Sequence, residues 1–320
     1  MQNDKIKVSI CVPIYGAEKY IAATARSLFA QSYDNIEYIF VNDCTKDRSI
    51  EILKDVVNEY PHRQNQTRII DNEHNSGLSA TRHNAVLQST GDYIFHFDDD
   101  DILLPDAIAR YVQKAEETDA DMVMADHNYV YLDHTTPYCD VVPQDKKEYV
   151  KRLLTRRSTI EIWGRLIRRS FILEHNLFAP DGLDLSEDFV LVPKMAYLAK
   201  KVAKVDAPLI NYLRYAGSGS TVVRRKGLET TVKAMQLLED FFTKIPDAAD
   251  YAETLKEARL HNKVTLYGIA AKADYPYVRA LYNDTPVWSS NISLTKKCLL
   301  TLAGWHLDSL VFRIIHHFTR

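Results

Sequence analysis

The sequence predicts an α/β protein in which a mostly parallel sheet is flanked by helices and followed by a helical C-terminal region. Two observations lead to this prediction. Between residues 7 and 125, short runs that are apolar on both faces alternate with segments whose apolar residues recur every three or four positions. This alternation is typical of parallel strands buried between layers of amphipathic helices. Helical spacing then dominates from Lys226 to Lys272.

The first half of the chain supplies strands and helices in alternation. A strand is expected over residues 7–14, and a helix from about Glu18 has Ile21 and Leu28 on its apolar face. The following strands and helices are expected in turn at 36–42, 50–60, 67–71, 78–87 and 92–97. Beyond residues 121–125 the alternation ends. A Tyr-rich irregular stretch follows, and then two helices are expected over 146–156 and 159–173.

Composition and charge exclude several classes of protein. With 320 residues, 46% of them hydrophobic, the chain can form one large domain with an appended smaller part. A net charge of −3 gives no reason to expect nucleic-acid binding, which needs a concentrated basic surface. The four cysteines include no C-x-x-C pair, so neither a disulfide framework nor a zinc knuckle is expected. The N-terminus lacks the apolar core of a signal peptide, and the apolar stretch 299–315 is too short and too polar to span a membrane, which predicts a cytoplasmic protein.

Acidic residues follow two of the expected strands, at the point where each strand ends. Asp43 comes directly after IEYIFVN, and four consecutive aspartates begin at Asp98, after DYIFHF. Because ligands bind at the carboxyl ends of parallel strands, both acidic clusters are expected to face one crevice. Four adjacent carboxylates repel one another, and a cation or a hydrogen-bond donor among them relieves the repulsion.

The D-x-D pair of Asp98 and Asp100 suits a hard divalent cation with oxygen ligands. Mg²⁺ or Mn²⁺ accepts few protein ligands when a diphosphate completes its coordination, so a nucleotide diphosphate is the expected partner. The alternative is that these acids cap the helix that begins near Pro105, where the helix dipole favours negative charge. We favour that alternative for Asp101 and Asp106, and metal binding for Asp98 and Asp100.

Four ordered segments carry a resemblance to a known family: VSICVPIYGAEKYI, FAQSYDNIEYIFVNDCTKDRS, NSGLSATRHNAVLQSTGDYI and FDDDDILLP. Over about residues 7–130 they resemble the family 2 glycosyltransferases, which have the Rossmann-like GT-A fold. The resemblance implies a metal-dependent enzyme that takes a sugar from a nucleotide diphosphate, UDP above all, and that builds bacterial surface polysaccharides. We therefore expect a glycosyltransferase domain at 1–220, with a nucleotide-binding half (about 7–130) and an acceptor half (about 131–220), and a helical region at 221–320.

The resemblance also implies roles for single residues. The first loop and Asp43 would hold the nucleoside, Asp98 would lie near the ribose, and Asp100, together with Asp98, would bind Mn²⁺ or Mg²⁺. Arg82 stands near the start of a helix, where it either meets a phosphate or carboxylate of the ligand or pairs with an aspartate of the cluster. The residues expected to bind the nucleotide sugar are Pro13, Tyr15, Glu18, Asp43, Arg82, Asp98 and Asp99.

The chain departs from the commonest family pattern after the second strand. There the family usually has two adjacent acids and then Gly, whereas Asn42 and Cys44 flank Asp43 in this chain. Gly16 likewise stands where the family often has Asn. Because Asn both donates and accepts where Asp only accepts, the preferred nucleotide stays open. Asp43 is either a ligand of the base or a turn-forming residue at a strand end.

Transfer with inversion needs a base that takes a proton from the acceptor hydroxyl. LSEDFVLVPK supplies Glu187 and Asp188, a pair that resembles the family's E-D motif, in which the aspartate is the base. We assign this role to Asp188, with Glu187 as a contact of the acceptor or the diphosphate. The alternative is that Ser186 and the two acids only favour the start of a helix.

Two further segments are candidates for the acceptor and diphosphate sides. IEIWGRLIRRSFI resembles the Trp-containing helix that lines the acceptor side in the family, and Trp163 either stacks on a sugar ring or belongs to the core. YLRYAGSGSTVVRR has the composition of a mobile loop that closes over a diphosphate, or of a solvated basic loop. Its candidate cations are Arg214, Arg224 and Arg225.

We expect an inverting glycosyltransferase acting on a hydroxyl of a glycan or lipid-linked acceptor. One rival is a binding protein that keeps the nucleotide site without turnover. Another is an aspartyl-phosphate hydrolase, whose D-x-D would follow the first strand and not the fourth.

The C-terminus offers a second kind of contact. Apolar residues recur there at helical spacing: Leu299, Ala303, Leu307, Leu310, Ile314 and Phe318. Positive charge comes from Lys296, Lys297, Arg313 and Arg320. This pattern indicates either peripheral attachment to the inner face of the cell membrane, or packing on the protein itself or on a partner chain such as a second copy.

Overall fold

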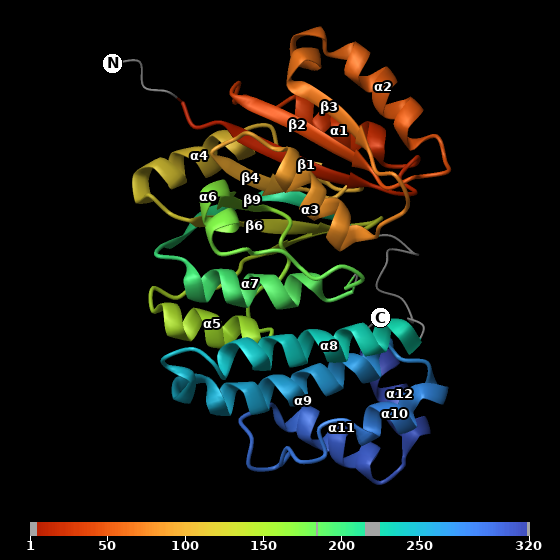
Figure 1. The fold of residues 1–320 in the computed structure, drawn as a ribbon. Coiled ribbons are helices and arrows are strands. Elements are labelled where there is room, and N and C mark those ends of the chain that lie inside the picture. The colour runs from red at the N-terminus through yellow and green to blue at the C-terminus, as the bar shows by residue number, and fades with distance from the viewer. Residues whose placement is uncertain (1–4, 184, 215–224, 319–320) are drawn as a thin grey trace. The chain divides into compact units, whose positions relative to one another are not determined.

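The computed structural model describes residues 5–183, 185–214 and 225–318, with side chains up to residue 315. Within these residues, nine strands form one mixed sheet in the order β3-β2-β1-β4-β8-β6-β9-β5, and β7 pairs with β6 (Figure 1). The strands are β1 (Val8–Ile14), β2 (Ile36–Asn42), β3 (Thr67–Asp71), β4 (Tyr93–His96), β5 (Ile102–Leu103), β6 (Met122–Val130), β7 (Thr135–Tyr138), β8 (Arg165–Arg168) and β9 (Val202–Leu213).

The N-terminal half of the sheet is parallel, as predicted. β1 pairs in parallel with β2 and with β4, and β2 pairs in parallel with β3. Ile14 stands opposite Asn42, so the carboxyl ends of β1 and β2 lie at one edge of the sheet. Beyond β4 the sheet is mixed, because β8 runs antiparallel between β4 and β6, while β9 is parallel to β6.

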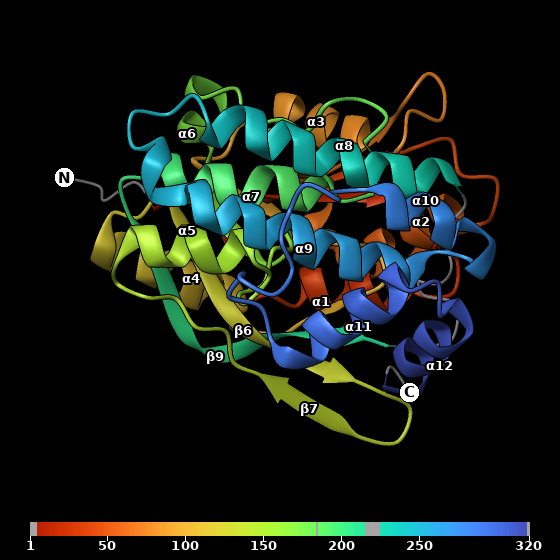
Figure 2. The same ribbon diagram turned by 90° about the horizontal axis from the view of Figure 1, so that it is seen from below.

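Helices cover both faces of this sheet. Alternate residues of β1, among them Val8, Ile10 and Val12, belong to one apolar core with residues of α1, α2 and α4. Helix α3 packs on β1 and β2 from the other face (Figure 2). The helices of this part are α1 (Ile21–Phe29), α2 (Ser49–Glu59), α3 (Leu78–Gln88), α4 (Ala107–Thr118) and α6 (Arg169–Glu174).

Two predictions about the middle of the chain were wrong. The helix expected over 159–173 is strand β8 followed by the short helix α6, and Trp163 lies in a turn before the strand. Leu166 and Ile167 are both fully buried, so the strand shows no alternation that would distinguish it from a helix. The Tyr-rich stretch is not irregular throughout, because β6 runs to Val130 and β7 follows it.

The chain folds as two compact units. Unit 1 comprises 1–146, 161–184 and 195–215 and contains the sheet; unit 2 comprises 147–160, 185–194 and 216–320. Helix α7 (Glu187–Leu198) contributes residues to each of them. The other helices of unit 2 are α5 (Lys146–Leu154, whose first residue ends the first segment of unit 1), α8 (Arg225–Phe242), α9 (Ala252–Ile269), α10 (Tyr275–Ala280), α11 (Leu294–Gly304) and α12 (Asp308–Phe318). The helical pattern predicted from Lys226 to Lys272 is thus confirmed in α8 and α9.

The apolar residues that were predicted to share one helical face at the C-terminus are divided between the core of unit 2 and its surface. The chain turns between α11 and α12, where His306 has a φ of 61°. Leu299 and Ala303 are buried in the core of unit 2, whereas Leu307 and Leu310 are exposed. Among the described residues, no helix is both long and apolar enough to cross a bilayer.

Candidate active site

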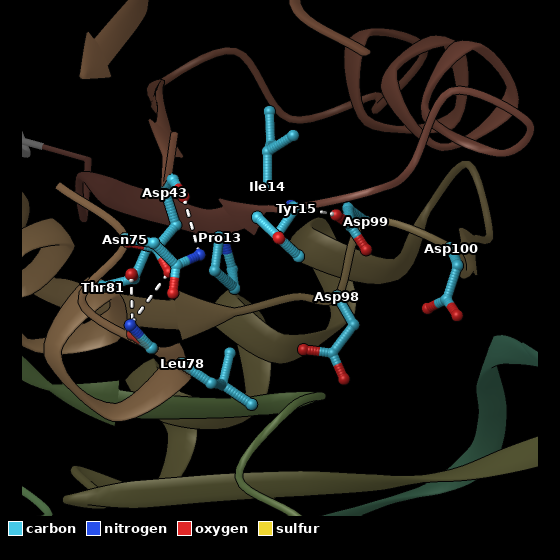
Figure 3. Close-up of a pocket in the computed structure, with 11 residues that line it drawn as sticks. Pro13, Ile14, Tyr15, Asp43, Asn75, Leu78, Thr81, Asp98, Asp99 and Asp100 are labelled. Atoms are coloured by element: carbon cyan, nitrogen blue, oxygen red, sulfur yellow. Dashed lines mark hydrogen bonds between the residues drawn. The ribbon is translucent and has the colours of Figure 1, made fainter. Parts of the chain in front are cut away.

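A pocket of about 400 Å³ opens at the carboxyl ends of β1, β2 and β4. It is lined by Pro13, Ile14, Tyr15, Asp43, Asn75, Gly77, Leu78, Thr81, Asp98, Asp99 and Asp100. Figure 3 shows Asp43, Asn75 and Thr81 on one side of the first loop, and the three aspartates on the other. The structure therefore brings the two acidic clusters to one crevice, as the strand-end rule predicts.

Asp43 organises the loop between β3 and α3. Its Oδ1 accepts hydrogen bonds from the Ser76 amide (2.7 Å) and from Asn72 Nδ2 (2.9 Å), and its Oδ2 accepts one from the Gly77 amide (2.9 Å). Asn75 Nδ2 donates to the main-chain carbonyl of Asp43 at 3.0 Å. A carboxylate offers about four acceptor positions, so a ligand N–H can still reach the side chain. Asp43 thus holds a turn and also faces the pocket.

The first loop is tied to both acidic clusters. The Tyr15 amide donates to Asp99 Oδ2 at 3.1 Å, while the Tyr15 side chain is 59% exposed and free to meet a ligand. Glu18 is not among the lining residues. Its Oε2 accepts from the Arg48 amide at 3.1 Å, at the start of α2, which gives it a place in the loop framework.

Arg82 is buried on α3, and its Nη2 donates to Asp98 Oδ1 at 2.7 Å. This ion pair is one of the two roles predicted for the guanidinium. The ion pair fixes one oxygen of Asp98 in the pocket wall. His96, nearby in β4, is buried, and its burial and the charge of Arg82 lower its pKa to about 3, which keeps the imidazole neutral.

Asp99 and Asp101, the other two aspartates that carry raised pKa values, are more deeply buried. Burial and the charge of Asp100 raise the pKa of Asp99 to about 8. Asp101 is only 1% exposed, and its Oδ1 accepts from the Leu213 amide at 3.0 Å. Burial and the charges of Asp98 and Asp100 raise its pKa to about 9.

The capping role predicted for Asp101 was wrong, whereas Asp106 stands at the start of the helix as predicted. Asp101 bonds to β9, not to a helix. Asp106 does stand at the N-cap of α4, but its side chain makes no capping hydrogen bond and lies 3.8 Å from Arg110. The backbone turn after β4 points Asp101 toward the sheet, and that turn cannot be deduced from four identical residues.

The donor set fits a divalent cation that keeps most of its coordination sphere for substrate. Asp98 and Asp100 line the same pocket and are hard oxygen donors. Among the described residues, no group of three or more His, Cys, Asp or Glu side chains is placed to hold a metal by itself. Mg²⁺ accepts coordination by two carboxylates when diphosphate oxygens and water supply the remaining ligands.

An aromatic cluster lies beside the acidic turn in unit 1. Trp163 stacks on Tyr212 with centroids 5.1 Å apart and rings 3° from parallel, and His127 meets the Trp163 ring edge-on at 5.3 Å. The guanidinium of Arg214 lies 5.7 Å from the Tyr212 ring and 5.6 Å from the Tyr129 ring. Trp163 is half-buried, so it packs on Tyr212 and retains some exposed surface.

The remaining candidates lie in unit 2 or outside the described residues. Glu187 and Asp188 form the first turn of α7, where Glu187 is buried and Asp188 half-buried. Arg225 pairs with Asp274 at 3.2 Å and stacks on Tyr277, which favours a structural role. Arg224 lies outside the described residues.

Residues 9–175, just over half of the chain, match the family described as Glycosyl transferase family 2. The chain belongs to this family. The putative glycosyltransferase EpsH of Bacillus subtilis (strain 168) is 32% identical over 212 residues, covering 64% of this chain and 60% of EpsH. A poly(ribitol-phosphate) beta-glucosyltransferase of Bacillus spizizenii is 25% identical over 322 residues, covering 97% of this chain and 45% of that protein. The chain thus spans only part of the length of these relatives.

Solved structures of similar proteins agree with the fold. S. aureus TarS (residues 1–349) in complex with UDP aligns with a TM-score of 0.66 at 17% identity, covering 98% of this chain and 90% of that one. The mannosyltransferase PcManGT of Pyrobaculum calidifontis, in complex with GDP-Man and Mn²⁺, aligns with a TM-score of 0.55 at 14% identity, covering 98% and 88%. These likenesses confirm the predicted GT-A fold.

The departures from the family 2 pattern have a local explanation. Asn42 Nδ2 donates to Asp71 Oδ1 at 2.8 Å and its Oδ1 accepts from the Thr45 amide at 2.9 Å, so the side chain uses both functions of an amide. Cys44 has a φ of 58°, in the region that glycine adopts most readily, which explains the family's usual Gly there. Here Cys44 Sγ donates to the Asn72 carbonyl at 3.2 Å.

Several pocket residues were missed by the sequence reasoning. They are Ile14, Asn75, Gly77, Leu78 and Thr81, and all but Ile14 lie in the loop before α3 or in its first turn. The signal was present in NSGLSAT, because Asn, Ser and Gly before a helix indicate a tight turn with exposed amides at the helix start. Gly77 has a φ of 83°, as such a turn requires.

Proposed function

We propose that the protein is a metal-dependent inverting glycosyltransferase. It transfers a sugar from a UDP-linked donor to a hydroxyl of a glycan or lipid-linked acceptor in surface polysaccharide synthesis. The observation that carries this proposal is the pocket in which Asp43, Asp98 and Asp100 meet at the carboxyl ends of three parallel strands. Membership of family 2 supports the reaction class.

The donor would lie across the pocket, with its base toward Asp43 and its diphosphate toward the aspartate turn. On the base side, Asp43 keeps an acceptor position for an N–H donor, and the pocket there is also lined by Pro13 and Leu78. On the other side, Asp98 and Asp100 would hold Mn²⁺ or Mg²⁺, which supplies positive charge to the leaving diphosphate. The complexes of TarS with UDP and of PcManGT with Mn²⁺ support these assignments by similarity of fold.

Two residues of the chain have proposed roles in the reaction, Arg82 in positioning and Asp188 in proton transfer. Arg82 holds Asp98 in place, since their 2.7 Å ion pair limits where that carboxylate can point. Asp188 accepts the proton of the acceptor hydroxyl as its oxygen forms a bond to the anomeric carbon, while the bond from that carbon to the diphosphate breaks on the opposite face. The products are the inverted glycoside and the nucleoside diphosphate. Asp188 is assigned this role from the SED motif and its place in the first turn of α7.

The aromatic cluster is the proposed contact for the acceptor. The half-buried ring of Trp163 and the exposed guanidinium of Arg214 offer an apolar surface and a cation on the same part of unit 1. A relative that acts on poly(ribitol-phosphate) supports a polymeric acceptor for this chain. A cation beside stacked rings suits a sugar polymer that carries phosphate.

The test separates binding from turnover. A panel of sugar nucleotides with Mn²⁺ is first screened by thermal shift, because a ligand of the folded state raises its stability. With the selected donor and an acceptor that turns over, Asp188→Asn should leave the dissociation constant nearly unchanged and lower turnover by about 10² to 10⁴-fold. Glu187→Gln, its neighbour in the same turn, should cost less.

Three results would contradict the proposal. Wild-type turnover in the Asp188 variant would move the base elsewhere. NMR of a product that retains the anomeric configuration would exclude a single displacement. Binding of nucleotide sugars without turnover on any glycan or lipid-linked acceptor would indicate a binding protein.

A further inference from the structure

Five exposed apolar residues lie on the last two helices of unit 2 and in the turn that joins them. Leu294 and Trp305 are 67% and 68% exposed, and Leu307 and Leu310 are 43% and 44% exposed. Cys298 is exposed as well. Positions 294 and 298 lie on one side of α11, because a step of 4 residues nearly completes one turn, and Trp305 is the C-cap of the same helix. We call these five residues the α11–α12 apolar face.

This face is not needed for the core of unit 2. The opposite sides of α11 and α12 already supply buried residues to that core, among them Leu299, Leu300, Ala303, Val311 and Ile315. The two helices also contact each other (Figure 2). Single exposed apolar residues are ordinary, but five within two successive helices that contact each other are a group of the kind that marks an interaction surface.

The charge around the face is positive. Between residues 285 and 320 the sequence contains four Lys or Arg residues and a single acid, Asp308. Asp308 is hydrogen-bonded by Arg279 Nη2, so its charge is compensated. Asp274, in the 3-10 turn that packs on α12, is likewise paired with Arg225 at 3.2 Å. Arg313 is exposed on α12, and Lys297 lies on α11 next to Cys298.

We propose that the α11–α12 apolar face binds the surface of an anionic lipid bilayer. Trp and Leu side chains enter the boundary between head groups and acyl chains, and neighbouring Lys and Arg residues are attracted to anionic lipid. Since no described helix can span a membrane, the attachment is peripheral. A second copy of the chain is a poorer occupant, because a symmetric contact would bring Lys297 and Arg313 of both copies together without an exposed acid from this segment to pair with them. This inference does not depend on the proposed function.

Co-sedimentation of the full chain with vesicles tests the proposal. The chain should pellet with phosphatidylcholine vesicles that contain phosphatidylglycerol, and much less with phosphatidylcholine alone. The pair Trp305→Ser and Leu310→Ser should abolish most of the binding. The pair Lys297→Glu and Arg313→Glu should lower the affinity for anionic vesicles by about 30-fold or more, since each basic residue near the surface adds roughly 1 kcal/mol.

The matched control is Leu132→Ser. Leu132 is 98% exposed in the turn between β6 and β7 in unit 1, so the change removes an exposed leucine away from the face. Its vesicle binding should equal that of the unaltered chain. Point variants are preferable to truncation, because removing α11 and α12 would open the core of unit 2. Thermal unfolding of each variant confirms that it is folded.

The proposal would be overturned by equal binding to neutral and anionic vesicles, or by full binding of the Trp305 and Leu310 variant. It would also be overturned if the chain bound no vesicles and sedimentation velocity showed a dimer that dissociates in that variant. The face would then be a contact between copies.

Discussion

The side chain of Asp43 is predicted to act on nucleotide binding largely through the loop that it holds. The critical change is Asp43→Asn, which removes the charge and keeps the size. In the native chain, Oδ2 accepts from the Gly77 amide at 2.9 Å and Oδ1 accepts from Ser76 and Asn72. Asparagine can keep its oxygen toward Ser76 and Asn72, but its NH₂ group then faces the Gly77 N–H, donor against donor.

The expected loss of UDP affinity follows from the loss of one hydrogen bond, from the Gly77 amide to the charged Asp43 side chain. Such a bond contributes about 1.5 to 3 kcal/mol, because the carboxylate is a stronger acceptor than a neutral oxygen. That free energy corresponds to roughly 10- to 150-fold in the equilibrium between the ordered and opened loop. The loop carries Asn75 and Gly77 into the pocket, so the dissociation constant for UDP should rise by up to the same factor.

Two measurements distinguish this positioning role from a simple ligand contact. Hydrogen exchange of the Ser76 and Gly77 amides, in the protein without nucleotide, should be faster in the variant. Calorimetric titration with UDP should show the weaker binding. Glu73→Gln is the matched control, since it removes an exposed acid from the same loop. Unchanged exchange together with weaker UDP binding would refute the argument and leave Asp43 as a ligand contact alone.

Two further predictions concern acid stability and the metal. Burial raises the pKa of Glu37, but hydrogen bonds from Ser9, Thr90 and Lys7 outweigh it and lower the pKa from 4.5 to about 2. The stabilisation is therefore present above pH 4.5 and is lost as the pH falls toward 2, and Glu37→Gln should reduce the free energy of unfolding by about 3 kcal/mol at pH 7 and by less at pH 3. Urea denaturation at both pH values checks this, and equal losses at the two would contradict it. The variant Asp100→Asn should fold normally but lose the increase in UDP affinity that Mn²⁺ gives. Calorimetric titrations with UDP, with and without Mn²⁺, measure this increase. An unchanged increase in the variant would contradict the metal-binding role of Asp100.

The parallel half of the fold could be predicted because its physical signals are local. β1 and β2 are buried on both faces, and helical segments of sufficient length separate them. Once the strands are assigned, the strand-end rule alone places Asp43 and Asp98 at one edge. No long-range information was required for that step.

The rest of the sheet depends on pairing that the sequence does not show. β8 is a strand because it fits between β4 and β6, where Tyr93 pairs with Arg168 and Met122 with Ile167. Its four residues carry no turn signal that would set them apart from the helix that follows. Tertiary pairing here overrides local propensity.

In the site, too, the sequence indicates the type of residue at a position but not the contacts that the residue makes. A carboxylate after a strand indicates an acidic edge, but not which amides it accepts from, and Asp43 uses three donors from a loop about 30 positions later. Those donors exist only once β2 and β3 lie side by side with α3 packed over them. The pocket residues of that loop were missed for this reason.

The run of four aspartates is tolerated because the fold treats its members differently. Asp98 has a guanidinium at 2.7 Å, and Asp99 accepts from the Tyr15 amide. Asp101 is buried against β9. Its pKa is raised to about 9 and that of Asp99 to about 8, so both carboxyl groups are largely protonated at neutral pH. Burial is the larger cause in both. The remaining repulsion that raises these pKa values comes from Asp98 and Asp100, the two that line the pocket with a D-x-D spacing. A cation bound between Asp98 and Asp100 would offset that repulsion, so the charge that raises the pKa values of their neighbours is the same charge that favours a metal–diphosphate ligand.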